Sequence, residues 1–224
     1  SSATTITSTG TLTIAPFGNS FTNGSNVARA FTWSGSGTTN FAGTGSINAI
    51  TINSIANLGG LVIGKSSSTE NSNVTISNAI SITGPISIYG NDIALGASLT
   101  STGSNKAITL AAARNISTTA ISLSVTTNGG DILLASNISG SAGSINLSRF
   151  TLTSAGGDIT LGGGSDGLSY ALGNAADTSV PSYTNQSKYK GVFLNGVTIN
   201  AEGSSVGGNI LDSTGINILN GVIS

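Results

Sequence analysis

The sequence contains no cysteine, no histidine and no methionine in its 224 residues. Without thiols or imidazoles it can form no disulfide, no zinc site, no Cys nucleophile and no His-based acid–base pair. Only 7% of the residues are charged, and the net charge of -1 gives no attraction to nucleic acid or to an anionic membrane. We therefore expect no cofactor, no metal, no nucleic-acid partner and no enzymatic activity.

Long apolar runs are also missing. No run approaches the roughly 20 residues that a membrane-spanning helix needs, so we expect no transmembrane segment. The beginning of the chain lacks a basic region followed by an apolar stretch, so no signal peptide is visible. The chain opens at SSATTITS without an initiating Met and stops at ILNGVIS, both strand-like. We expect it to be a piece of a longer polypeptide.

What the sequence does contain is short apolar alternation between polar turns. Hydrophobic residues make up 38% of the chain, which is enough to build a core, and 32 glycines punctuate it. Apolar residues two positions apart place both side chains on one face of a strand. Such pairs are Ile80/Ile82, Ile86/Ile88, Ile93/Leu95, Ile108/Leu110, Ile121/Leu123, Ile132/Leu134, Ile145/Leu147 and Ile159/Leu161. Each pair predicts a very short strand with one buried face.

Equivalent strands recur at a regular interval. Ile86, Ile108, Ile132 and Ile159 follow one another at 22 to 27 residues, a period typical of repeat architectures. Apolar spacing of 3.6 is absent from segments of ten or more residues, so helical repeats are excluded. We predict an all-β fold, a parallel β-helix (β-solenoid) with about three short strands per coil and with loop excursions. About nine coils spaced by about 4.8 Å would make a rod of roughly 45 Å.

The predicted organisation is one β-helix over residues 1–224. Its parts are aromatic-rich first coils (1–57), a loop (58–72), regular coils (73–164), a loop excursion (165–190) and further coils (191–224). The first part holds most of the large aromatic residues, namely Phe17, Phe21, Phe31, Trp33 and Phe41. These rings either fill the core or form a platform on which sugars stack.

Two similar phrases mark corners of the predicted coils. They are TNGGDILL, residues 127–134, and SAGGDITL, residues 154–161. Glycine tolerates the positive φ that such bends often require. Asp131 and Asp158 precede a buried strand, where a carboxylate typically accepts backbone N–H groups. Calcium binding is the alternative, although GGGSDG at 162–167 matches the GGxGxD calcium repeat only in part.

Residues 165–190 interrupt the repeat with a segment too long for a corner. Binding residues often lie on loops that a rigid scaffold carries, so this segment supplies the candidate ligand or partner contacts. They are Tyr170, Asp177, Tyr183, Lys188, Tyr189 and Lys190. Alternatively, the segment packs on the flank of the helix or contacts a neighbouring chain.

The phrases GGDILL, GGDITL, AITLAAARNI, NAISITGPISIYGNDIAL and GVFLNGVTINAEG resemble coils of large bacterial exoproteins of the filamentous haemagglutinin type. The resemblance covers about residues 46–224 and carries no catalytic motif. It implies a right-handed parallel β-helix in the passenger shaft of an adhesin exported by two-partner secretion or in an autotransporter-like way. The NPNL and NPNG signatures of the family's secretion domain are absent from this sequence.

These observations predict a rod-like, extracellular or cell-surface scaffold that adheres to glycans or proteins of host cells and surfaces, or to like chains. A self-assembling filament or sheath subunit is the alternative. A polysaccharide-active enzyme would need clustered carboxylates, whereas the eight acidic residues are scattered. Ice binding would need stacked Thr-x-Thr pairs. The pairs Thr5/Thr7, Thr11/Thr13 and Thr151/Thr153 do not recur at the coil period in the sequence.

Overall fold

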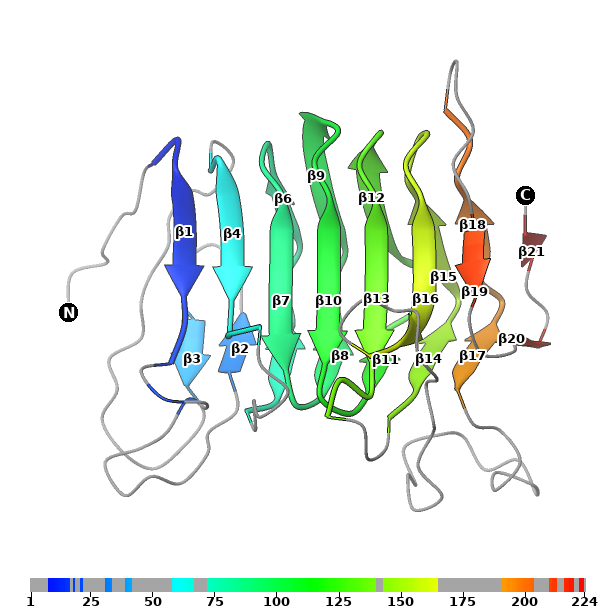
Figure 1. The fold of residues 1–224 in the computed structure, drawn as a ribbon, viewed down its shortest axis with the longest axis horizontal. Helices are drawn as coiled ribbons and strands as arrows, with labels where there is room; N and C mark the ends of the chain where they lie inside the picture. The colour runs from blue at the N-terminus through cyan, green and yellow to red at the C-terminus, as the bar shows by residue number, and fades with distance from the viewer. Residues whose placement is uncertain are drawn as a thin grey trace.

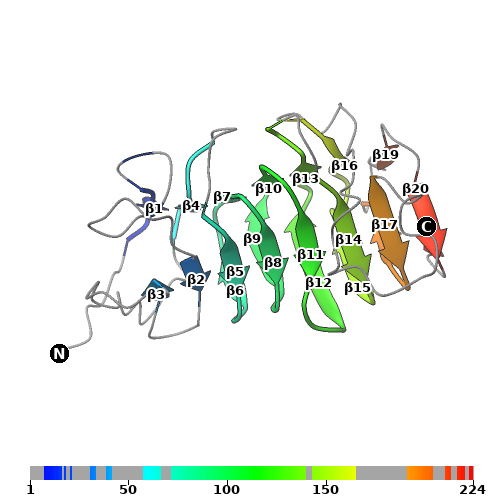
Figure 2. The ribbon, with the colours of Figure 1, turned by 90° about the horizontal axis from the view of Figure 1, so that it is seen from below.

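The computed structural model describes residues 8–16, 18, 21, 31–33, 39–41, 58–66, 72–139, 143–164, 191–203, 210–212, 216–219 and 222–223. Over these residues the chain is all-β, without a helix, and its strands form three stacked sheets. The fold is the predicted right-handed parallel β-helix with three strands per coil. The coils follow one another along the longest axis of the molecule, from the N-terminus to the C-terminus (Figures 1 and 2).

Each complete coil contributes one strand to each sheet, in a constant order. The seven-stranded sheet contains, in spatial order, β1 (Thr11–Ile14), β4 (Gly60–Ile63), β7 (Ile86–Gly90), β10 (Ile108–Ala112), β13 (Ile132–Ser136), β16 (Ile159–Gly163) and β19 (Ile210–Asp212). The eight-stranded sheet contains β3 (Thr39–Phe41), β2 (Phe31–Trp33), β5 (Val74–Ile76), β8 (Ile93–Leu95), β11 (Ile116–Thr118), β14 (Ile145–Ser148), β17 (Val192–Asn195) and β20 (Ile216–Leu219). The six-stranded sheet contains β6 (Ile80–Ile82), β9 (Leu99–Ser104), β12 (Leu123–Asn128), β15 (Phe150–Thr153), β18 (Thr198–Asn200) and β21 (Val222–Ile223).

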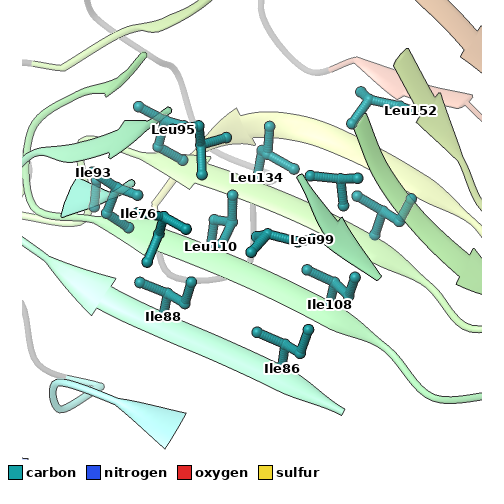
Figure 3. Close-up of a cluster of buried hydrophobic side chains, with 14 of the residues drawn as sticks. Ile76, Ile86, Ile88, Ile93, Leu95, Leu99, Ile108, Leu110, Leu134 and Leu152 are labelled. Atoms are coloured by element: carbon teal, nitrogen blue, oxygen red, sulfur yellow. The ribbon is translucent and has the colours of Figure 1, made fainter. Parts of the chain in front are cut away.

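Apolar side chains from the three sheets meet inside the coil. In the seven-stranded sheet, Ile86 pairs with Ile108 and Ile108 with Ile132, so identical residues lie above one another. Figure 3 shows such side chains from several strands pointing into one shared interior. Burying an Ile or Leu side chain contributes about 1.5 to 3 kcal/mol, and the columns repeat this gain in every coil. The core is therefore a continuous apolar column along the helix.

Among the described residues the three sheets have six to eight strands, fewer than the nine coils expected. With a spacing of about 4.8 Å, the first and last of seven strands lie about 29 Å apart, whereas the first and last of nine would lie about 38 Å apart. β1 pairs directly with β4, and β16 with β19, although each pair lies about two coil lengths apart in the sequence. Two long connections therefore add no strand between these neighbours.

One predicted strand pair is wrong. Ile121 is 59% exposed and precedes β12, whereas Val125 is fully buried in that strand. Ser122 has a positive φ of 59°, which interrupts the alternation between Ile121 and Leu123. The seven other pairs of the series have both side chains in the core.

The N-terminal end of the eight-stranded sheet departs from the parallel pattern. β3 pairs antiparallel with β2, and β2 continues the parallel ladder through β5. Phe21, Phe31 and Trp33 are buried there, and the rings of Phe21 and Phe31 stack with centroids 5.4 Å apart. Core packing is therefore confirmed for these three residues. Phe17 and the side chain of Phe41 lie outside the described set.

The two glycines of each GGD corner have different roles. Gly129 and Gly156 adopt positive φ values of 82° and 113°, as predicted for a bend. The second glycine is required by close approach of successive coils. A Cβ on Gly157 would lie 2.4 Å from the carbonyl oxygen of Gly130, which no side chain could avoid. These corners therefore set how closely one coil rests on the next.

The alternation in β13 provides a direct test of the core. Leu134 is fully buried, and its neighbour Leu133 points to the opposite face and is half-buried. We expect Leu134→Ala to lower the free energy of unfolding by about 2 to 5 kcal/mol, because it leaves a cavity between stacked coils. Leu133→Ala is the matched control and should cost less than half as much in urea denaturation. Equal losses would contradict the assigned faces.

The corner glycines provide a second test. Gly157→Ala should destabilise the fold by about 1 to 3 kcal/mol or more, because the added methyl overlaps the backbone of the coil before it. Gly18→Ala is the control, since nothing lies within 4 Å of a Cβ at that position. Thermal unfolding followed by circular dichroism measures both. A Gly157→Ala protein as stable as the control would show that the coils do not approach so closely.

Candidate functional site

The predicted contact residues Tyr170, Asp177, Tyr183, Lys188, Tyr189 and Lys190 lie outside the described residues. The two ends of their segment are described. Gly164 follows β16 and Gly191 precedes β17, so the segment leaves from a corner between the seven- and eight-stranded sheets. The same corner takes two residues between β7 and β8 and three between β10 and β11. The corner is longer in other coils, with eight residues between β13 and β14 and ten between β4 and β5, and the excursion of residues 165–190 starts and ends at this corner.

A ladder of polar side chains runs along this same corner. Asn73 Oδ1 accepts a hydrogen bond from the backbone N–H of Asp92 at 3.2 Å, and Asp92 Oδ1 accepts one from Asn115 N–H at 3.3 Å. The next step repeats the pattern, because Ser144 N–H donates to Asn115 Oδ1 at 3.0 Å. Each side chain thus binds a backbone donor in the following coil. We call these four residues the corner ladder.

The only ion pair among the described residues lies on the corner ladder. Arg114 Nε donates to Asp92 Oδ1 at 3.0 Å, and Arg114 Nη2 contacts Asp92 Oδ2. The two side chains are 45% and 23% exposed, so the pair contributes at most about 1 kcal/mol. The carboxylate of Asp92 is therefore occupied by an arginine and a backbone donor, which is a structural role.

The aspartates of the GGD corners behave as the sequence predicts. Asp131 Oδ1 accepts a hydrogen bond from the backbone N–H of Asp158, in the following coil, at 2.9 Å. The interpretation that a carboxylate satisfies a backbone donor is confirmed for Asp131. Within the described part of the chain, no three acidic side chains come together as a metal would require. Gly162 to Gly164 are described, but the rest of GGGSDG is not.

The outer face of the six-stranded sheet carries a regular array of hydroxyl groups. In β12 and β15, Ser124 pairs with Thr151 and Thr126 with Thr153. The array continues to Thr198 in β18, opposite Thr151, and to Thr100 in β9, opposite Thr126. Ser81 in β6 pairs with Thr100. We call these outward residues the hydroxyl face: Ser81, Thr100, Ser124, Thr126, Thr151, Thr153 and Thr198.

The hydroxyl face adds to one sequence-based inference. No Thr-x-Thr pair recurs at the coil period, so the sequence predicts no flat array of threonines alone. The register places Ser124/Thr126 directly beside Thr151/Thr153, and a serine hydroxyl repeats the chemistry of threonine. The alternating Ser and Thr residues are present in the sequence. Their array becomes visible only when the strands are aligned and Ser is counted together with Thr. Thr5/Thr7 lies outside the described residues.

The outer faces of the other two sheets are more mixed. In the seven-stranded sheet, one outward column runs through Val62, Ser87, Thr109, Leu133 and Thr160. In the eight-stranded sheet, the outward column of Thr75, Ala94, Ser117 and Asn146 reaches Phe193, which is buried, and continues to Asn217. Each column contains apolar side chains between the polar ones. The hydroxyl face is thus the most uniform surface of the described coils.

Comparison with models of protein families, with curated proteins and with solved structures found no match. The described residues include no helix with the length and hydropathy that crossing a bilayer requires.

Sequence reasoning missed the corner ladder. Its signal is a polar residue directly before the second strand of each coil, at Asn73, Asp92, Asn115 and Ser144. Three different residue types fill this position, so the column becomes visible only when β5, β8, β11 and β14 are aligned.

The corner ladder predicts which property of Asp92 matters. Asp92→Ala should lower the free energy of unfolding by about 1 to 3 kcal/mol, because the backbone N–H of Asn115 loses its acceptor. Asp92→Asn keeps a side-chain oxygen and loses only the exposed ion pair, so it should cost less than about 1 kcal/mol. Urea denaturation of both variants measures the difference. An equal loss of stability in Asp92→Ala and Asp92→Asn would show that Asp92 stabilises the fold through its ion pair with Arg114 and not through the N–H of Asn115.

Proposed function

We propose that this chain is a structural and adhesive part of a secreted bacterial cell-surface protein, without catalytic activity of its own. Its β-helix acts as a scaffold, and residues 165–190 contact the target. The partners are glycans or proteins on surfaces and host cells, or like chains. The resemblance of GGDILL, GGDITL and related phrases to the coils of large exoproteins supports this proposal.

One observation carries the proposal. From β4 to β16 the coils repeat every 22 to 27 residues, whereas Ile159 and its partner Ile210 are 51 positions apart, as Thr11 and Gly60 are 49 apart in the first coil. The extra length is concentrated between Gly164 and Gly191, at a corner that takes two or three residues after β7 and β10, eight after β13 and ten after β4. The 26 residues of this insertion include three tyrosines and two lysines. Such loops on rigid scaffolds are where binding residues concentrate.

The roles of the acidic residues support a non-catalytic scaffold. The carboxylate of Asp92 holds Arg114 and a backbone N–H, and that of Asp131 holds the N–H of Asp158. A hydrolase of sugars needs two carboxyl groups about 5 to 10 Å apart across a groove. These two aspartates instead stabilise different corners, one after β7 and the other before β13.

The C-terminal edge of the described coils favours a second candidate function, end-to-end assembly into a filament. β19, β20 and β21 are the last strands of the three sheets. The outer backbone groups of these strands have no strand partner in the described part of the chain. Parallel edges of this kind pair readily with a further coil or with another chain.

Deleting residues 165–190 tests the proposed contact segment. The deletion places Ile159 and Ile210 25 positions apart, which is within the normal coil period, and leaves two residues between β16 and β17. The β-helix should therefore keep its fold and its circular dichroism spectrum. Adhesion of coated beads to cells or to surface glycans should fall to the level of uncoated beads.

A control variant replaces residues 165–190 by a Gly/Ser linker of the same length, which keeps the insertion but removes its tyrosines and lysines. It should lose adhesion as the deletion does. Unchanged adhesion in both variants would refute the role of this segment. Analytical ultracentrifugation of the same proteins separates the filament alternative, because assembly through β19–β21 would persist in both.

A further inference from the structure

We propose that the hydroxyl face binds the surface of ice, or more generally a crystalline layer of water. This inference concerns a different surface from residues 165–190 and does not depend on the proposed adhesive function. It rests on the register of the six-stranded sheet, on the hydrogen-bonding state of the hydroxyl groups and on the absence of charged and aromatic side chains from this face.

The register turns the hydroxyl groups into a two-dimensional lattice. Ser124, Thr151 and Thr198 form one rank across β12, β15 and β18. Thr100, Thr126 and Thr153 form a second rank across β9, β12 and β15. Neighbouring strands lie about 4.8 Å apart, and residues two apart on one strand lie about 6.6 Å apart. The hydroxyl groups thus repeat in both directions over β12 and β15, and Asn200 in β18 stands beside Thr153 at the end of the second rank.

The hydroxyl groups of this lattice are available to a ligand. None of the seven side chains of the hydroxyl face makes a hydrogen bond within the described part of the chain, and all are at least partly exposed. The buried hydroxyls on the inner side of the same sheet differ, because they are used by the fold. Thr127 donates to the carbonyl of Ser154 at 3.1 Å, and Ser101 donates to that of Gly84 at 2.8 Å.

The chemistry of the face favours ordered water over other ligands. The strands β6, β9, β12, β15 and β18 contain no charged residue, so ions and charged polymers gain nothing there. Their one aromatic residue, Phe150, is buried, so the face offers no ring on which a sugar could stack. Each hydroxyl contributes only about 1 kcal/mol to a hydrogen bond after the exchange with water. Because each hydroxyl contributes so little, a ligand has to contact many of these hydroxyl groups at once to bind stably.

Ordered water meets this requirement at the lowest cost. The hydroxyl groups are already hydrated in solution, and waters held by fixed polar groups cost between about 0 and 2 kcal/mol of entropy each. A crystalline layer keeps these waters in place and adds no desolvation of the protein. A threonine methyl group cannot hydrogen-bond, so it leaves the waters around it to bond with one another. The same lattice therefore supports growth of a water layer but not capture of a single small molecule.

The test measures the gap between melting and freezing temperatures of a single ice crystal in a solution of the purified chain. The proposal expects a measurable gap and a faceted crystal. In the variant carrying both Thr126→Tyr and Thr151→Tyr, two bulky rings stand in the middle of the lattice and the gap should disappear. Thr126→Val keeps the shape of the side chain but removes a hydroxyl, and it should reduce the gap.

The matched controls are Thr109→Tyr and Thr75→Tyr, which place the same ring on the outer faces of the seven- and eight-stranded sheets. Both should retain the full gap. The proposal is overturned if the folded chain shows no gap, or if the controls lose as much activity as the hydroxyl-face variants. A polysaccharide ligand would also overturn it. In that case the chain would bind an insoluble polysaccharide, only the hydroxyl-face variants would lose this binding, and no gap between melting and freezing would be measured. Deletion of 165–190 should leave the gap unchanged.

Discussion

The in-register parallel ladder between coils is the interaction on which the rest of this structure depends. Because every strand pairs with its counterpart one coil away, each side chain is placed above an equivalent side chain, as Ile86, Ile108 and Ile132 are. Parallel pairing satisfies the backbone donors and acceptors along the whole stack. Burial then accumulates coil by coil, because each coil packs on the coils before and after it.

This constraint acts most strongly at the corners, where the chain has to turn without disturbing the spacing of its coils. The second glycine of the GGD corner allows backbone atoms to approach where a Cβ would collide. The corner ladder satisfies backbone N–H groups that no strand pairs, such as those of Asn115 and Ser144. The corners therefore place specific demands on residue type, a glycine where two backbones approach closely and a side-chain oxygen where an N–H group needs an acceptor.

The sequence predicts the repeat well because a coil is a local unit. The alternation in Ile108/Leu110 and the glycines before Asp131 and Asp158 are sufficient to indicate strands, corners and stacking. The prediction fails where one backbone angle changes the face, as Ser122 does for Ile121. It also misses surfaces that exist only after the coils are aligned, since the hydroxyl face combines Ser and Thr from four or more coils. The residues proposed for adhesion remain a prediction, because their segment lies outside the described residues.

The corner ladder has a direction. Asn73, Asp92 and Asn115 each offer a side-chain oxygen to the coil that comes later in the chain, and Asp131 does the same at another corner. A finished coil thus presents acceptors that the next coil has to meet, in addition to its exposed strand edges. When the chain folds from its N-terminal end, each new coil can pair with the strand edges and side-chain acceptors of the coil before it. The stack is built to grow vectorially, with each coil guiding the one that follows it.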